Sequence, residues 1–231
     1  MNQTADAGQR IYSKRVLSLY DLWVLGFSNH LLWKCPTRLI SQQFRNRVSP
    51  NHLDVGVGSG YYLKKHLPHN QPRIALMDLN QNSLTVAANA IKAHQAEVYC
   101  RNVLAPLHLP CERFDSVSIN YLLHCLPGSM ADKSVVFAHL KTCMNDGAVL
   151  FGSTILGAAA VDAAPGNPPL NRAASKLMAF YNQKGIFSNR QDSLATLSAA
   201  LTQHFVHVNI RLVGCVALFW AHKAHSADDQ P

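Results

Sequence analysis

The sequence predicts an α/β fold, in which strands and helices alternate and build a mostly parallel sheet covered by helices. Three observations lead to this fold. Short apolar runs are followed by helical patterns through the middle of the chain, a glycine-rich turn joins the first run to its helix, and two strand-like runs around a tight turn close the chain. The length of 231 residues suits one such domain with a small cap.

Residues 1–48 are expected to form a helical cap on a core domain at 49–231. Apolar residues of 11–33 recur at helical spacing in one stripe, and a polar helix follows to about Arg47. Such a stripe is typical of an amphipathic helix packed on a core. The functional alternative is a cap that brings Tyr20, Trp23 and Trp33 to a ligand, and an interfacial membrane helix is a third alternative.

The core begins with an apolar strand at 53–57 that contains Asp54 and runs into Gly56, Gly58 and Gly60. A helix over 61–67 follows, and Pro68 ends it. Glycine at these positions permits positive φ and a close approach of ligand to backbone. A dinucleotide-binding fingerprint would need another glycine at position 61, where the chain has tyrosine.

The next elements continue the alternation of strand and helix. The run at 73–78 ends in Asp78 and predicts a buried parallel strand, and Asn80 opens a helix that reaches about 93. Ser129 starts a capping box, which predicts a helix to about 144 that ends at 145–147. Further strands are expected at 97–101, 114–121 and 148–155.

Residues 157–187 interrupt this rhythm and are expected to form a lid or a substrate wall. The part at 157–169 is rich in Ala, Gly and Pro and predicts a loop, and 176–181 predicts a short helix. A capping box at Ser188 is expected to open the next helix. Runs at 205–212 and 213–221 then predict an antiparallel hairpin.

Composition narrows the function classes. The net charge of +8 would suit an anionic partner such as RNA, but the basic residues are scattered without a five-residue run, which argues against nucleic acid. The six cysteines form no C-x-x-C pair and suit reduced thiols in a cytoplasmic protein. No uncharged stretch is long enough to span a membrane, and no histidine pair has a third ligand for a metal.

The pattern Asp-x-Gly-x-Gly-x-Gly at 54–60, together with the closing hairpin, resembles the class I S-adenosyl-L-methionine (SAM)-dependent methyltransferases. The resemblance covers about residues 50–155 and 186–222. It implies a Rossmann-like, mostly parallel seven-stranded sheet whose last strand is antiparallel. It also implies SAM as the cofactor and an enzyme that transfers its methyl group.

The resemblance assigns cofactor contacts to positions that match the family's motifs. Asp54 would hold the amino-acid end of SAM beside the three glycines, and Asp78, 22 residues after Gly56, would bind the ribose hydroxyls. Leu79 would pack on the adenine, and Asn102 with Val103 would contact its edge. The family often has an acid where this chain has Asn102, whose side-chain carbonyl could accept the same hydrogen bond. Tyr20 of the cap would also face the cofactor.

The segment Asn120-Tyr121-Leu122-Leu123-His124 matches the family's motif beside the methyl group. Relatives that modify adenine or glutamine have two prolines directly after the asparagine of this motif. This chain has Tyr121 and Leu122 after Asn120 instead, which favours a small-molecule acceptor. His124 is either a general base or a structural residue. Trp23, Trp33 and Tyr181 are expected to face the acceptor, whose nucleophile is expected to be O or N.

Three alternatives to a small-molecule methyltransferase stay open. An RNA methyltransferase would need a basic surface near residues 45–65. A non-catalytic partner subunit with the same fold would bind SAM without transferring its methyl group. A nicotinamide-dependent oxidoreductase is disfavoured by Tyr61 and by the closing hairpin. The sequence leaves the oligomeric state open, a homodimer included.

Overall fold

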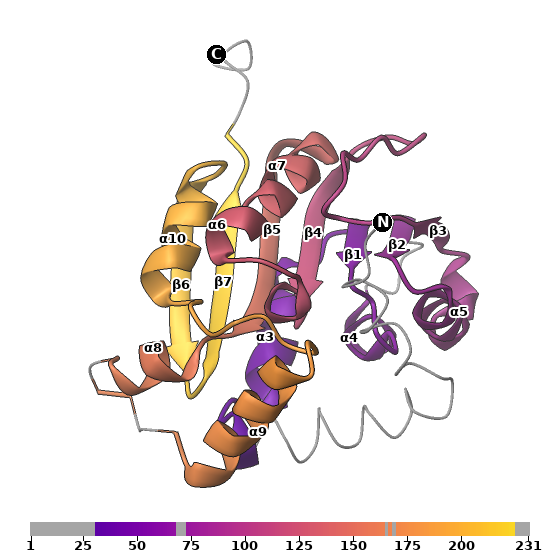
Figure 1. Cartoon of the computed structure of the whole chain (residues 1–231). Helices are drawn as coiled ribbons and strands as arrows, with labels where there is room; N and C mark the ends of the chain where they lie inside the picture. The colour runs from indigo at the N-terminus through magenta and orange to yellow at the C-terminus, as the bar shows by residue number, and fades with distance from the viewer. Residues whose placement is uncertain (1–30, 68–72, 165, 168–169, 225–231) are drawn as a thin grey trace.

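The computed structural model describes residues 31–67, 73–164, 166–167 and 170–224 (Figure 1). The expected helix over 11–33, with Tyr20 and Trp23, lies outside the described residues except for its last three positions, 31–33. No helix within the described ranges is long and apolar enough to cross a membrane.

The described residues build one seven-stranded sheet in the order β3-β2-β1-β4-β5-β7-β6. Neighbouring strands from β3 to β5 pair in parallel, whereas β7 is antiparallel to both β5 and β6. The strands are β1 (Asn51–Val55), β2 (Arg73–Asp78), β3 (Glu97–Cys100), β4 (Phe114–Asn120), β5 (Met144–Ile155), β6 (Val206–Val213) and β7 (Val216–His222). The predicted parallel sheet with an antiparallel last strand is confirmed.

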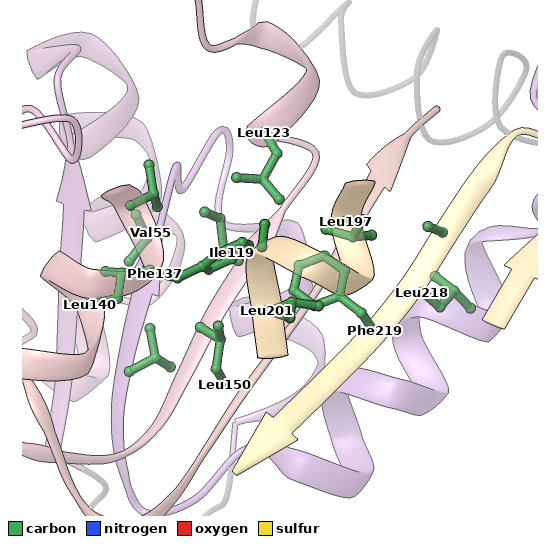
Figure 2. Close-up of a cluster of buried hydrophobic side chains, with 14 of the residues drawn as sticks. Val55, Ile119, Leu123, Phe137, Leu140, Leu150, Leu197, Leu201, Leu218 and Phe219 are labelled. Carbon is green, nitrogen blue, oxygen red and sulfur yellow. The ribbon is translucent and has the colours of Figure 1, made fainter. Parts of the chain in front are cut away.

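Helices cover both faces of the sheet. One face carries α3 (Thr37–Arg47), α4 (Tyr61–His66) and α5 (Gln81–Ala90), which bury a core around Phe44, Leu76 and Phe151. The other carries α6 (Met130–Lys133), α7 (Val135–Thr142) and α10 (Leu194–Thr202), which lie in front of the sheet in Figure 1. Figure 2 shows the larger core under these helices, where Phe137 and Leu197 meet side chains of the central strands.

Short helical segments occupy several connections. The segment 157–187 contains α8 (Ala158–Asp162) and α9 (Arg172–Gln183). Two 3-10 turns lie at Lys92–His94 and Leu123–Cys125. The prediction of a loop throughout 157–169 is therefore wrong, because the alanines after Gly157 form a short helix with Val161 buried beneath it. The expected helix at 176–181 is confirmed and extends from 172 to 183.

Two other boundaries differ from the prediction. The capping box that opens α10 is Ser193 with Thr196, not Ser188, because 188–192 instead form a loop bound to the core. Asn189 is buried there and donates its side-chain amide to the Ile155 and Leu156 carbonyls. The expected helix end at 145–147 lies within β5, which starts at Met144 and pairs with Phe114 ahead of a register shift.

Candidate active site

The glycine turn after β1 adopts the positive-φ backbone that its sequence predicts, with φ of 71°, 53° and 74° at Gly56, Gly58 and Gly60. A Cβ atom at Gly60 would lie 3.0 Å from the Cα atom of Ala87 in α5, so this glycine permits close helix packing. A Cβ atom at Gly58 would meet no atom of the described residues within 4 Å. Gly58 therefore presents bare backbone to open space, as a ligand site requires.

Asp54 lies on β1 immediately before this turn and is buried. One carboxylate oxygen accepts a short hydrogen bond from the Ser118 hydroxyl on β4. Burial raises the pKa of the Asp54 carboxyl to about 7, the Ser118 bond lowers it, and the nearby Asp78 carboxylate raises it. A cationic group bound beside Asp54 would stabilise its ionised form, so the site suits an ammonium.

Asp78 ends β2 next to the same turn. It accepts a hydrogen bond of 2.8 Å from the Asn80 backbone N–H. Burial raises its pKa, and backbone N–H groups, including those of Val57 and Gly58, oppose that rise. Leu79 follows with 40% of its surface exposed. The acid at the turn and the exposed apolar side chain beside it fit a ribose and its attached base.

The two residues expected at the edge of the adenine, Asn102 and Val103, already make contacts within the protein. The side-chain carbonyl of Asn102 accepts a hydrogen bond of 3.0 Å from the Leu104 N–H, which closes a turn. The Val103 side chain is buried in the core, and its carbonyl lies 2.9 Å from His139 Nδ1. The Asn102 oxygen that the sequence assigns to the adenine amino group is thus already bonded within the protein.

The segment after β4 packs on the glycine turn, because a Cβ atom at Gly56 would lie 2.9 Å from Leu122 Cδ2. Asn120 accepts a hydrogen bond of 3.0 Å from the Ser153 hydroxyl, and its buried side-chain nitrogen has no partner among the described residues. Tyr121 holds a φ of 54°, which is strained for a side chain of this size. An orphaned buried donor beside a strained residue is typical of a functional site.

His124 is 2% exposed in the 3-10 turn that follows. Its Nδ1 atom accepts a hydrogen bond of 3.4 Å from the Ile155 backbone N–H, so the proton of the neutral ring lies on Nε2. Burial and, secondly, the Lys133 charge lower its pKa to about 3. His124 is therefore neutral across the physiological pH range.

Aromatic side chains gather around His124. We call Trp33, Tyr121, His124, Tyr181 and Phe187 the aromatic cluster. Phe187 is its centre, with ring centroids 4.5 Å from His124, 4.9 Å from Tyr181 and 6.1 Å from Trp33. The Tyr121 and His124 rings lie 5.8 Å apart. The structure thus brings Trp33 and Tyr181 to the residues expected beside the methyl group, with Trp33 almost fully buried.

Two residues of this region escaped the sequence analysis. Ser118 bonds the Asp54 carboxylate, and His52, two positions before Asp54, bonds Ser118 in turn. The available signal was a polar residue at every second position of an apolar strand, since Ser116 and Ser118 share one face of β4. Among the described residues, no group of three His, Cys, Asp or Glu side chains could hold a metal ion.

Comparison with known proteins agrees with this geometry. A family model described as a methyltransferase domain matches residues 53–150. Demethylluteothin O-methyltransferase of Streptomyces thioluteus is 33% identical over 222 residues, which cover 96% of this chain and 93% of the relative. The physcion biosynthesis cluster O-methyltransferase of Aspergillus chevalieri is 36% identical over 221 residues, which cover 94% of this chain and 96% of the relative.

A solved structure has the same fold. The N-methyltransferase NodS of Bradyrhizobium japonicum, in complex with S-adenosyl-L-homocysteine (SAH), superposes with a TM-score of 0.63 at 15% identity, covering 96% of this chain and 99% of that one. The two relatives, each matched over more than nine-tenths of its length, show the family to which this chain belongs. The chain belongs to the S-adenosylmethionine-dependent methyltransferases.

Proposed function

We propose that this enzyme transfers the methyl group of SAM to a hydroxyl oxygen on a small, planar, conjugated molecule. The observation that carries this proposal is the aromatic cluster, which packs five ring side chains together at the end of β4. Flat aromatic faces favour stacking or edge contacts with a conjugated ring. The names of the two relatives, which are both O-methyltransferases, support oxygen as the acceptor atom.

The reaction needs little chemistry from the protein. SAM, when bound, supplies a methyl group on a positively charged sulfur. The bond from sulfur to methyl breaks as the bond from acceptor oxygen to methyl forms, and the hydroxyl proton is lost to solvent. In this proposal Asp54 binds the ammonium of the cofactor and Asp78 binds its ribose. Gly58 gives the cofactor room, and Asn120 can donate its free N–H group to it.

The protonation state of His124 bears on the class of acceptor. A general base works best when its pKa lies near the operating pH, and burial holds the pKa of His124 at about 3. Its Nδ1 lone pair is also occupied by the Ile155 N–H. In this proposal His124 is therefore a wall of the acceptor site and not the base. We therefore infer an acceptor whose hydroxyl is acidic by itself, such as a phenol or an enol.

The insertion at 157–187 is proposed as the outer wall of the acceptor site. It supplies Tyr181 from α9 and leads into Phe187. The loop at 188–192 holds this wall against the core, since the Ser188 N–H donates to the His124 carbonyl over 2.8 Å. Tyr20 and Trp23 keep their proposed place in a cap at 1–48, which lies mostly outside the described residues.

A panel of acceptors tests the proposal. The purified enzyme with methyl-labelled SAM is offered phenols and enols of graded acidity, matched anilines and a structured RNA. Mass spectrometry should find O-methylated conjugated acceptors, and the pH dependence of kcat/KM should follow the pKa of each acceptor. Transfer only to nitrogen or RNA would contradict the proposal. Binding of SAM without transfer to any acceptor would favour a non-catalytic partner subunit.

A further inference from the structure

A line of polar side chains runs through the sheet core behind Asp54. The parallel register sets His52 opposite Ser116 and Asp54 opposite Ser118, so all four side chains share one face of β1 and β4. His52 Nδ1 lies 2.7 Å from the Ser116 hydroxyl oxygen, and its Nε2 lies 2.9 Å from that of Ser118. Ser118 in turn bonds the Asp54 carboxylate. We call these four residues the Asp54 relay.

The chemistry of each member fixes the direction of these bonds. An ionised carboxylate only accepts, so the Ser118 hydroxyl donates to Asp54. Ser118 then accepts from His52 Nε2–H, which leaves Nδ1 to accept from the Ser116 hydroxyl. Ser116 itself accepts a hydrogen bond of 2.9 Å from the Ser49 backbone N–H. Every donor of the relay therefore points toward Asp54, and each ring nitrogen of His52 has one partner.

The surroundings keep His52 neutral, as this direction requires. It is 0% exposed and packed between two apolar rings, Phe44 of α3 at 5.5 Å and Phe151 of β5 at 5.8 Å between centroids. Burial lowers its pKa to about 3. Among the described residues, the charged group that acts on Asp54 is the Asp78 carboxylate on β2. Its negative charge disfavours ionisation of Asp54.

We propose that His52 and Ser118 are positioning residues for the cofactor. The neutral imidazole holds the Ser118 hydroxyl toward Asp54, which orients the carboxylate and favours the ionised form that binds the ammonium of SAM. This inference rests on the binding of SAM at Asp54. It adds to the site two residues that need not touch the cofactor, because they act through the Asp54 carboxylate.

A purely structural role makes a different prediction. If His52 and Ser118 had only a structural role, apolar side chains of similar volume could fill the space between Phe44 and Phe151 without burying any polar group. Substitutions of His52 or Ser118 would then change stability alone. A positioning role also changes how SAM binding depends on pH. Asp54 must be ionised to bind the ammonium, and its pKa is raised to about 7. Affinity should therefore rise with pH through that value and level off above it.

The experiment measures SAH affinity by calorimetry across a pH range that spans this midpoint. Ser118→Ala removes the hydroxyl that stabilises the carboxylate, so the midpoint should move to higher pH. Affinity at neutral pH should fall about tenfold, which corresponds to about 1.4 kcal/mol. His52→Leu should shift the midpoint in the same direction. His52→Gln keeps an N–H donor near the position of Nε2 and should restore much of the wild-type behaviour.

The control is Ser134→Ala, since Ser134 is a buried serine that bonds Gln203 at the C-terminal end of α10 and should leave the midpoint unchanged. Wild-type midpoint and affinity in folded Ser118→Ala and His52→Leu would overturn the inference while leaving the enzyme assignment intact. If His52→Leu does not fold, Ser118→Ala decides, because it removes a single oxygen atom. A wild-type chain that does not bind SAH would contradict both the inference and the proposed function.

Discussion

Lys133 and Asp192 form an ion pair in the interior, with Nζ 2.7 Å from Oδ2 and side-chain exposures of 0% and 1%. Lys133 also donates to the Ser188 carbonyl over 2.6 Å. One ammonium group thus ties α6 of the core to both ends of the loop at 188–192. Because this loop follows Phe187, the pair holds the centre of the aromatic cluster in place.

Loss of one partner of this pair should destabilise the fold. Lys133→Met leaves the Asp192 carboxylate buried without its cation, so the free energy of unfolding in urea should fall by about 3–5 kcal/mol. The double variant Lys133→Met with Asp192→Leu removes both charges and should recover most of that loss. A double variant that is no more stable than the single one would show that the buried charge is not the cause.

Asp78 should contribute to cofactor affinity. Asp78→Ala removes the carboxylate proposed to bind the ribose, so SAH should bind at least tenfold more weakly, as a lost hydrogen bond to a charged group is worth about 1.5–3 kcal/mol. Calorimetry measures this change. Asp115→Ala is the matched control, because Asp115 is exposed at the opposite end of the sheet, where it bonds Asn51 and Asn145. Equal affinity of the Asp78 variant and wild type would remove Asp78 from the site.

Two glycines of the turn should respond differently to alanine. Gly60→Ala places a methyl group 3.0 Å from the Cα atom of Ala87 at a φ of 74°, so overpacking of about 1–3 kcal/mol adds to about 1–2 kcal/mol of backbone strain in lowering the free energy of unfolding. Gly58→Ala has open space and adds only about 1–2 kcal/mol of backbone strain, but its methyl group enters the space proposed for the cofactor. It should therefore weaken SAH binding more than Gly60→Ala does. The reverse order of effects on binding would place the ligand elsewhere.

Buried neutral histidine should make the fold sensitive to acid. His124 has a pKa of about 3 when folded, against an ordinary value of 6.5, so below 6.5 the unfolded chain binds a proton that the folded chain does not. The contribution of neutral His124 to the free energy of unfolding is fully present above pH 6.5. It is lost as the pH falls toward 3, by about 1.4 kcal/mol per pH unit.

His124→Phe isolates this contribution, because other titrating groups cancel in the comparison. The free energy of unfolding of wild type, minus that of the variant, should decrease as urea titrations move from neutral to acidic pH. A difference that is constant with pH would mean that the pKa of His124 is the same in the folded and in the unfolded chain.

The local parts of the site were predictable from sequence, because short-range chemistry specifies them. The positive φ at position 58 could be predicted because the residue there is glycine. The location of Asp78 beside the turn could be predicted because Asp78 ends an apolar strand. The Asp54 relay depends on the register between β1 and β4, which brings residues about 64 positions apart into contact and leaves no local trace. Ser188 fits a capping pattern as well as Ser193 does, and the buried contacts of Asn189 decide between them.

In the proposed complex, SAM binds between Asp54 and Asp78 with its sulfur toward the aromatic cluster. A crystal structure of the enzyme with SAH tests this most directly. We expect the SAH ammonium on the Asp54 carboxylate, the ribose hydroxyls on Asp78, and the sulfur facing Asn120 and the cluster around Phe187. SAH bound away from the glycine turn, or with its sulfur turned from that cluster, would contradict it.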